Sequence, residues 1–195
     1  KIQHVFGLGD ITDRDSKKEW ETAYSAISKM DDKISYSLVR GNHDSTKMFN
    51  KTFNNETYKK QFEGFYSEYI DTSYMLFTVC ETDYLFITLD YGASDEELQW
   101  AAEKIKMYPN HRVIITTHGY LNYDGTTLDS KDGSYPSDLN DKNDSPDKVY
   151  NTGEDMWNKL ISKHANIFMV ISGHIDYCDI VSNKREGIHG NTVVE

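Results

Sequence analysis

Residues 2–10 read IQHVFGLGD, an apolar run of strand length that passes directly into two glycines and an aspartate. A carboxylate at the carboxyl end of a strand, with glycines beside it, can face a crevice without a side chain blocking the approach. Asp10 is therefore a candidate ligand. The alternative is that Asp10 caps the following helix or closes a turn, and this stretch alone does not decide between the two.

Strand-like and helix-like segments alternate along the rest of the chain. Further apolar runs of strand length lie at residues 34–39, 74–79, 84–89, 113–117 and 167–172. Apolar residues repeat at steps of three and four over residues 20–30, 98–108 and 156–161, which predicts helices. This alternation predicts an α/β domain with covered sheets. Two runs with only a short break between them predict an antiparallel hairpin, so we expect mixed sheets.

Two stretches lack a regular pattern. Residues 41–70 are polar and aromatic, with weak helical content around residues 58–66. Residues 119–150 are rich in Gly, Asp, Asn, Ser and Pro and show no strand or helix pattern. A loop of more than about 15 residues in a compact domain is usually functional or disordered. Cys80 falls in a strand pattern and is expected to be a buried thiol, with a Cys80–Cys178 disulfide as the alternative.

Polar residues follow three more of these apolar runs. The sequence Gly-Asn-His-Asp occupies residues 41–44, His118 follows one run and His174 follows another. Each histidine alone is read more readily as a structural residue. Strand ends line one crevice in open α/β folds, so the coincidence favours a shared site. Asp10, Asn42, His118 and His174 offer two oxygens and two nitrogens, a set suited to manganese, iron or zinc.

Charge and length exclude some functions. The 195 residues predict a single domain over residues 1–195, and the net charge of −11 opposes nucleic-acid binding. It also makes an anionic substrate awkward unless bound cations supply positive potential. No apolar run approaches the roughly 18 residues that a membrane span needs. The acidic composition with few cysteines fits an extracellular or cell-envelope bacterial protein.

The order G-D-x-x-D, then G-N-H-D about thirty residues later, then a lone His and a G-H pair, resembles the calcineurin-like metallophosphoesterases. The resemblance spans residues 9–176. It implies a four-layer α/β/β/α sandwich and a dinuclear centre of two divalent metal ions (Mn, Fe or Zn). It further implies that Asp10 bridges the metals and that Asn42, His118 and His174 complete one of them. His43 would act on the substrate as a proton donor or transition-state stabiliser, with Asp44 orienting it.

Two departures from the family pattern bear on these expectations. The family's opening D-x-H strand is missing, and His4 lies in the middle of a strand pattern. The family's closing G-H-x-H has Asp176 in place of its second His, so either Asp176 or a residue such as His189 is the candidate ligand there. We therefore expect an excerpt of a longer protein with further domains, without its first and last strands and with an incomplete second metal site.

The implied activity is hydrolysis of a phosphoester by a metal-activated hydroxide, as a phosphatase or a phosphodiesterase. Candidate substrate contacts are Arg40, otherwise a surface arginine, and Tyr120, Asn122, Tyr123 and Asp124, otherwise a structural loop. The alternatives are a non-catalytic metal- or ligand-binding module with a degenerate second site, and a scaffold domain of a larger secreted protein. The sequence leaves the substrate, the metal and the oligomeric state open.

Overall fold

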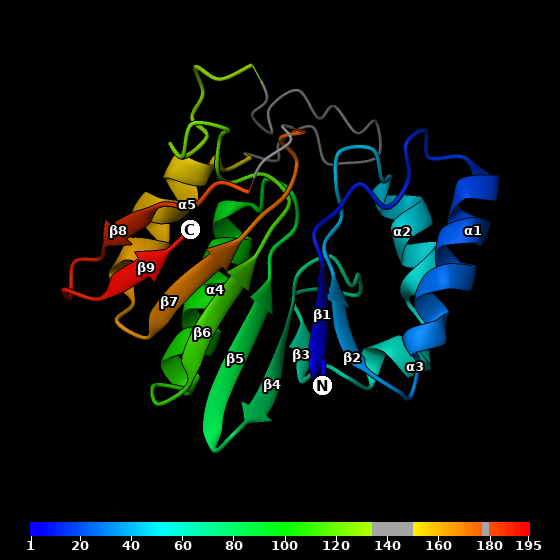
Figure 1. Ribbon diagram of the computed structural model, residues 1–195, viewed down its shortest axis with the longest axis horizontal. Coiled ribbons are helices and arrows are strands. Elements are labelled where there is room, and N and C mark those ends of the chain that lie inside the picture. Colours follow the sequence, from blue (N-terminus) through cyan, green and yellow to red (C-terminus); the bar gives the residue numbers. More distant parts are fainter. Residues whose placement is uncertain (134–149, 177–179) are drawn as a thin grey trace.

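The structure, a computed structural model, describes residues 1–133, 150–176 and 180–195. Strands and helices alternate along the chain (Figure 1). The strands are β1 His4–Gly7, β2 Ser35–Leu38, β3 Gly64–Phe65, β4 Ser73–Val79, β5 Thr82–Thr88, β6 Arg112–Thr116, β7 Ile167–Ile171, β8 Lys184–Glu186 and β9 Thr192–Val194. The helices are α1 Lys17–Ile27, α2 Thr46–Phe53, α3 Glu56–Lys59, α4 Asp95–Met107 and α5 Gly153–Lys159, with 3₁₀ helices η1 Ser28–Met30 and η3 Ile161–Lys163.

The strands form two sheets. β1 and β2 pair in parallel as a two-stranded sheet, and the other strands form a seven-stranded sheet in the order β3-β4-β5-β6-β7-β9-β8. β4 and β5 form the antiparallel hairpin that the sequence predicts, whereas β5, β6 and β7 are parallel. The expected mixed α/β architecture is confirmed, and neither sheet closes into a barrel.

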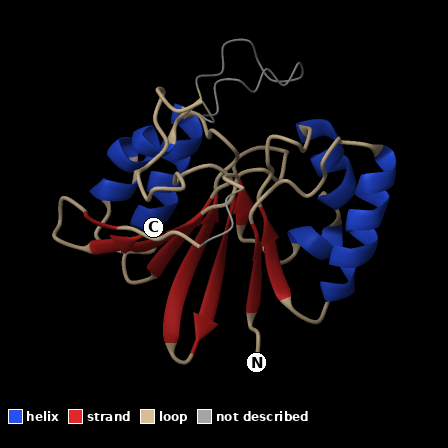
Figure 2. Cartoon of the chain, turned by 45° about the horizontal axis from the view of Figure 1, so that its top comes forward, coloured by secondary structure: helices blue, strands red, loops and turns tan. Residues whose placement is uncertain are grey.

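Three apolar cores separate four layers. One core joins the large sheet to α4 and α5, and a second joins the small sheet to α1, α2 and α3. The third lies between the sheets and includes Phe86 of β5 and Ile114 of β6. Neighbours of these residues, such as Leu85 and Val113, point into the helix-side core instead. Both faces of the large sheet are therefore buried, which explains its nearly continuous apolar strands. Figure 2 shows the helices on the two outer sides.

Side chains that cap the first turn mark where the helices begin. The three helices expected from periodicity each open with a capping box, headed by Ser16, Ser94 and Thr152. The weak helical content expected around residues 58–66 is limited to residues 58 and 59, because α3 ends at Lys59. Helices α2 and α3 begin at Ser45 and Asn55, whose side chains accept backbone N–H groups.

The expectations for Cys80 and for the long loop at residues 119–150 compare with the structure as follows. Cys80 is exposed in the turn between β4 and β5, not buried in a strand, because the chain reverses there with a positive φ of 48°. Cys178 lies outside the described residues, as do residues 134–149 of the long loop. The described start of that loop contains one isolated antiparallel bridge, between Leu121 and Thr127. Across the ranges described above, every helix is too short or too polar to span a bilayer.

Candidate metal centre

The four candidate ligands follow the carboxyl ends of four strands. Asp10 follows β1, Asn42 follows β2, His118 follows β6 and His174 follows β7. These strands all run toward the same edge of the molecule, where their connecting loops meet (Figure 1). The candidate side chains therefore lie at the edge where the sequence predicts a shared site.

These side chains are within reach of one another. Ligand atoms of Asp10, His118 and His174 all lie within 4.8 Å of each other. The Nε2 atom of His118 is at the centre, 3.2 Å from Asp10 Oδ2, 3.0 Å from Asn42 Oδ1 and 3.1 Å from His174 Nδ1. The structure thus brings together all four residues that the sequence singled out.

The tautomer of His118 makes this cluster a fit for a cation. Its Nδ1–H donates to the Leu8 carbonyl at 2.6 Å, which leaves Nε2 with a lone pair in the neutral ring. That lone pair faces the carboxylate oxygen of Asp10 and the amide oxygen of Asn42, neither of which carries a proton. Three acceptors in contact repel one another unless a positive charge lies among them. The donor set of oxygens and imidazole nitrogens matches a transition-metal ion.

Backbone conformation also marks this site. Asp10 and His174 both have positive φ values, 49° and 73°, which non-glycine residues rarely adopt. Two glycines allow the close approach of the loops. A Cβ at Gly9 would lie 2.3 Å from His118 Nδ1, and a Cβ at Gly41 would lie 2.2 Å from Asp10 Oδ1. No side chain fits at either position while the cluster keeps this geometry.

Asp44 ties the two ligand-bearing loops together. Its carboxylate accepts backbone N–H groups from Ile11, Thr12 and Gly41 at 2.9–3.1 Å, and the Thr12 hydroxyl at 2.9 Å. The predicted orientation of the His43 ring by Asp44 is therefore wrong. The Asp44 carboxylate is occupied by these donors, and His43 Nδ1 contacts a different residue.

His43 lies at the open rim of the cluster. Its side chain is 44% exposed, and its backbone N–H donates to Asp10 Oδ1 at 3.1 Å. Its Nδ1 is 2.6 Å from the Asp13 carbonyl, and this hydrogen bond is the main cause that raises the pKa of His43. A ring held in this way presents Nε2 as the nitrogen available to a substrate.

The Asp10 carboxylate is held in its charged form. Burial alone raises the pKa of Asp10, but a hydrogen bond from the His118 ring when that ring carries both of its protons, and the N–H of His43, offset this, so the pKa is below its usual value. A charged carboxylate among neutral donors is suited to binding a cation.

Comparisons with known proteins agree with this geometry. The model of the calcineurin-like phosphoesterase family matches residues 1–178. The chain belongs to the calcineurin-like phosphoesterase family. Membership supports metal-dependent hydrolysis of a phosphoester in general terms, and the resemblance in the motifs is confirmed.

Two curated proteins are similar to this chain. Uncharacterized protein YvnB of Bacillus subtilis (strain 168) is 28% identical over 183 residues, which cover 89% of the chain and 12% of YvnB. The probable glycerophosphodiester phosphodiesterase GpdQ of Arcobacter nitrofigilis is 24% identical over 122 residues, 58% of the chain and 40% of GpdQ. The chain thus spans well under half the length of either relative.

Arg40 of this chain is neither a surface residue nor directed at a substrate. It is 2% exposed and forms a bidentate ion pair with Asp90, with both N–O distances 2.9 Å. Its third contact is with the Asp44 carbonyl at 3.2 Å. The predicted phosphate contact is therefore wrong, because the guanidinium is enclosed between the loops that follow β2 and β5.

The candidate substrate contacts in the long loop divide into two groups. Tyr120 is 1% exposed and donates its hydroxyl to Glu195, so the prediction that it contacts substrate at a solvent-facing rim is wrong. Tyr123 and Asp124 are exposed, and Asn122 is half-buried. Tyr123 and Asn122 stay candidates, whereas Asp124 accepts hydrogen bonds from Thr126 within its own turn.

The candidates for the second metal position do not join the cluster. Asp176 is exposed and lies outside the metal-binding group found among the described residues. His189 lies in the turn between β8 and β9, with Nε2 3.1 Å from the Lys163 carbonyl. His4 packs between the two sheets, where burial lowers its pKa to about 4. A ligand role for Asp176 stays a prediction.

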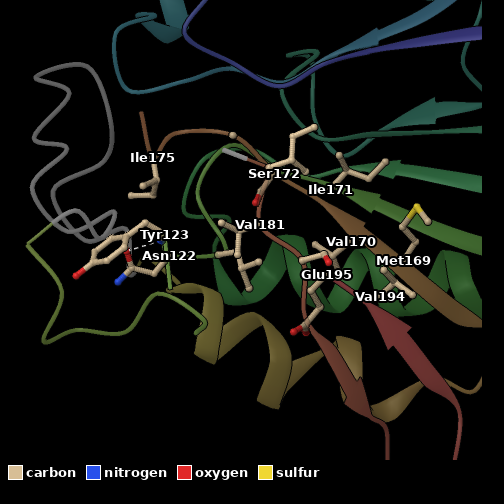
Figure 3. Close-up of a pocket in the computed structure, with 14 residues that line it drawn as sticks. Asn122, Tyr123, Met169, Val170, Ile171, Ser172, Ile175, Val181, Val194 and Glu195 are labelled. Carbon is tan, nitrogen blue, oxygen red and sulfur yellow. Dashed lines mark hydrogen bonds between the residues drawn. The ribbon is translucent and has the colours of Figure 1, made fainter. Parts of the chain in front are cut away.

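A cavity of about 370 Å³ adjoins the cluster (Figure 3). Its wall includes Gly173 and Ile175, on either side of His174 in the chain. Asn122 and Tyr123 lie together near Ile175 at one end of the cavity, and the rest of the lining includes apolar side chains of β7 together with Val181, Val194 and Glu195 (Figure 3). A space of this size and lining can hold a small organic group.

The sequence reasoning missed one side chain at the centre. Tyr91 contacts His174 and follows the carboxyl end of β5, in the sequence Asp90-Tyr91-Gly92. The pattern that could have identified Tyr91 is the same as for the other candidates, namely polar residues directly after an apolar run. A tyrosine is easily assigned to the core, which is why this pattern was overlooked.

Proposed function

We propose that this chain carries the hydrolytic centre of a phosphoesterase in which Asp10, Asn42, His118 and His174 hold a divalent metal ion, with Asp10 shared by a second. The observation that carries the proposal is the position of His118 Nε2, which lies 3.0 Å from the amide oxygen of Asn42 and 3.2 Å from a carboxylate oxygen of Asp10. Bound metal ions would polarise the phosphoryl oxygens and activate water at neutral pH.

The residues of the chain have separate roles in this proposal. Asp10 supplies a charged carboxylate, and Asp44 fixes the loops that carry Asp10 and Asn42. His43, exposed beside Asp10, donates a proton to the leaving oxygen through Nε2. The protein has a net charge of −11, so the bound cations would also provide the positive potential that a phosphate needs.

The organic part of the ester has a place beside the metals. The cavity next to His174 is lined largely by apolar side chains, and its end holds the exposed ring of Tyr123. We propose that the alcohol or aryl group of the substrate packs there. A Tyr123→Ala change is expected to raise KM for an aryl ester and leave kcat near its original value.

Hydrolysis of p-nitrophenyl phosphate and bis(p-nitrophenyl) phosphate tests the activity. The chain would be stripped of metal and supplied with manganese, with Asp10→Asn as the inactive variant and Asp124→Asn, on an exposed loop, as the matched control. We expect manganese-dependent turnover that Asp10→Asn abolishes and Asp124→Asn keeps. Turnover that survives Asp10→Asn would overturn the proposal, and metal binding without turnover would favour the non-catalytic module.

His43→Ala separates chemistry from metal binding. General acid catalysis contributes about 10²–10⁴-fold, so kcat should fall by that factor while manganese affinity stays unchanged. Full activity in His43→Ala would remove the residue from the reaction.

A further inference from the structure

Tyr91 packs against the two histidines of the cluster, His118 and His174. It lies in the segment between β5 and α4, and its side chain is only 2% exposed. Its hydroxyl oxygen is 3.2 Å from His174 Nε2. Its ring centroid is 5.2 Å from that of His118 and 5.1 Å from that of His174. The side chain therefore contacts both imidazoles of the cluster.

The neighbouring chain is shaped to admit this ring. A Cβ at Gly119 would lie 2.7 Å from Tyr91 Cε2, which is too close for any other residue. The Tyr91 ring meets the His118 ring edge to face at 78°, a favourable aromatic arrangement. Packing of this kind holds the hydroxyl oxygen in place, because the side chain has little room to move.

The hydroxyl contact decides which nitrogen of His174 faces the cluster. Nε2 is engaged by Tyr91, and Nδ1 is 3.1 Å from His118 Nε2. When Nε2–H donates to the tyrosine oxygen, Nδ1 keeps its lone pair and can bind a cation. When Nδ1 is protonated instead, it can donate to His118, and the tyrosine hydroxyl can donate to Nε2. A tyrosine can serve in both states because its hydroxyl is a donor and an acceptor.

We propose that Tyr91 is a positioning residue that holds His174 with Nδ1 directed at the metal site. This inference rests on the metal binding proposed above. Hydrogen-bond partners of metal-binding histidines fix their tautomer, and their loss typically costs 10–100-fold in metal affinity or activity.

The test is a Co²⁺ titration of the metal-free chain, followed by visible absorption and calorimetry. Tyr91→Phe keeps the ring and removes the hydroxyl. Tyr120→Phe is the matched control, since its buried hydroxyl donates to Glu195 and not to a histidine of the cluster. We expect Tyr91→Phe to bind Co²⁺ about 10–100-fold more weakly with an altered absorption spectrum. Tyr120→Phe should bind like the original chain, and circular dichroism with EDTA should show both variants folded.

A second measurement needs no variant. In the Zn²⁺-loaded original chain, ¹⁵N NMR should show His174 with a metal-bound Nδ1 and a protonated Nε2. Metal bound through Nε2 would overturn the inference, as would equal Co²⁺ affinity in Tyr91→Phe and the original chain. The latter outcome leaves the proposed function intact. Metal binding without phosphoester hydrolysis would sink the proposed activity alone, and absence of metal binding would overturn both.

Discussion

At the residue scale, hydrogen bonds to backbone groups give the site its chemistry. The Leu8 carbonyl accepts a hydrogen bond from Nδ1 of His118, and the Asp13 carbonyl accepts one from Nδ1 of His43. In both rings the opposite nitrogen is the one left to act. The loops that follow β1 thus determine how two histidines from other parts of the chain behave, although neither loop residue is itself a ligand candidate.

Asp44 provides the first prediction. Its carboxylate accepts four hydrogen bonds in a site where it is 1% exposed. Asp44→Ala leaves those donors without an acceptor, so unfolding in urea with EDTA present should show a loss of about 2–4 kcal/mol. Asp124→Ala, which removes hydrogen bonds in an exposed turn, should cost less than about 1 kcal/mol. Equal, small effects in both variants would mean that Asp44 does not clamp the loops.

At the element scale, the tight turn of the β4–β5 hairpin is strained by its sequence. Cys80 and Glu81 both have positive φ, 48° and 63°, where a hairpin of this kind favours Asn-Gly. Replacing the pair by Cys80→Asn with Glu81→Gly should raise the free energy of unfolding by about 0.5–1 kcal/mol. Cys80→Ala is the control, because it removes the thiol without relieving the strain. No gain from the double change relative to this control would argue against the turn geometry.

His4 makes the pairing of the sheets sensitive to acid. It lies on β1 between Ser35 and Ser37 and against Phe77 of the other sheet, and burial lowers its pKa to about 4 from 6.5. Between these values the unfolded state binds more protons, so stability is lost as the pH falls from about 6.5 to about 4. From pH 7.5 to pH 5 this group should cost about 1–2 kcal/mol.

His4→Phe isolates that contribution. The difference in stability between pH 7.5 and pH 5, measured by urea unfolding, should be smaller in His4→Phe than in the original chain. An identical difference in both proteins would show that His4 titrates normally. The site residues do not enter this comparison, since His4 contacts none of them.

Apolar patterns in the sequence predicted β1, β2, β4, β5, β6, β7 and the three helices with capping boxes, because these segments bury continuous apolar faces. They did not predict the short strands β3, β8 and β9. They also missed α2 and α3, whose starts depend on the side chains of Ser45 and Asn55. The sequence identified the candidate ligands because each follows the carboxyl end of an apolar strand. It did not predict the partners of Arg40 and Asp44, because contacts between residues far apart in sequence depend on how the sheets pack.

At the scale of the whole molecule, the buried Arg40–Asp90 pair connects the two halves of the sandwich. Arg40 follows β2 of the small sheet, and Asp90 follows β5 of the large one. Asp90 also accepts the Thr117 hydroxyl through its carbonyl, next to His118. This buried ion pair thus links the two sheets whose loops carry the candidate ligands.

Arg40→Met tests this connection. It leaves a buried carboxylate without its partner, so unfolding in urea should show a loss of about 3–5 kcal/mol. Lys60→Met breaks the exposed pair with Asp32 and serves as the control, with an expected loss of less than about 1 kcal/mol. A similarly small loss for Arg40→Met would mean that packing alone holds the sheets together.

The most direct test of the metal centre is anomalous diffraction from crystals of the chain soaked in Mn²⁺. The account predicts a manganese peak among Asp10 Oδ2, Asn42 Oδ1, His118 Nε2 and His174 Nδ1, at about 2.0–2.3 Å from the ligand atoms. A second peak on the far side of Asp10 would mark the shared carboxylate. Crystals with no manganese at these atoms, or with manganese only at other surface carboxylates, would contradict it.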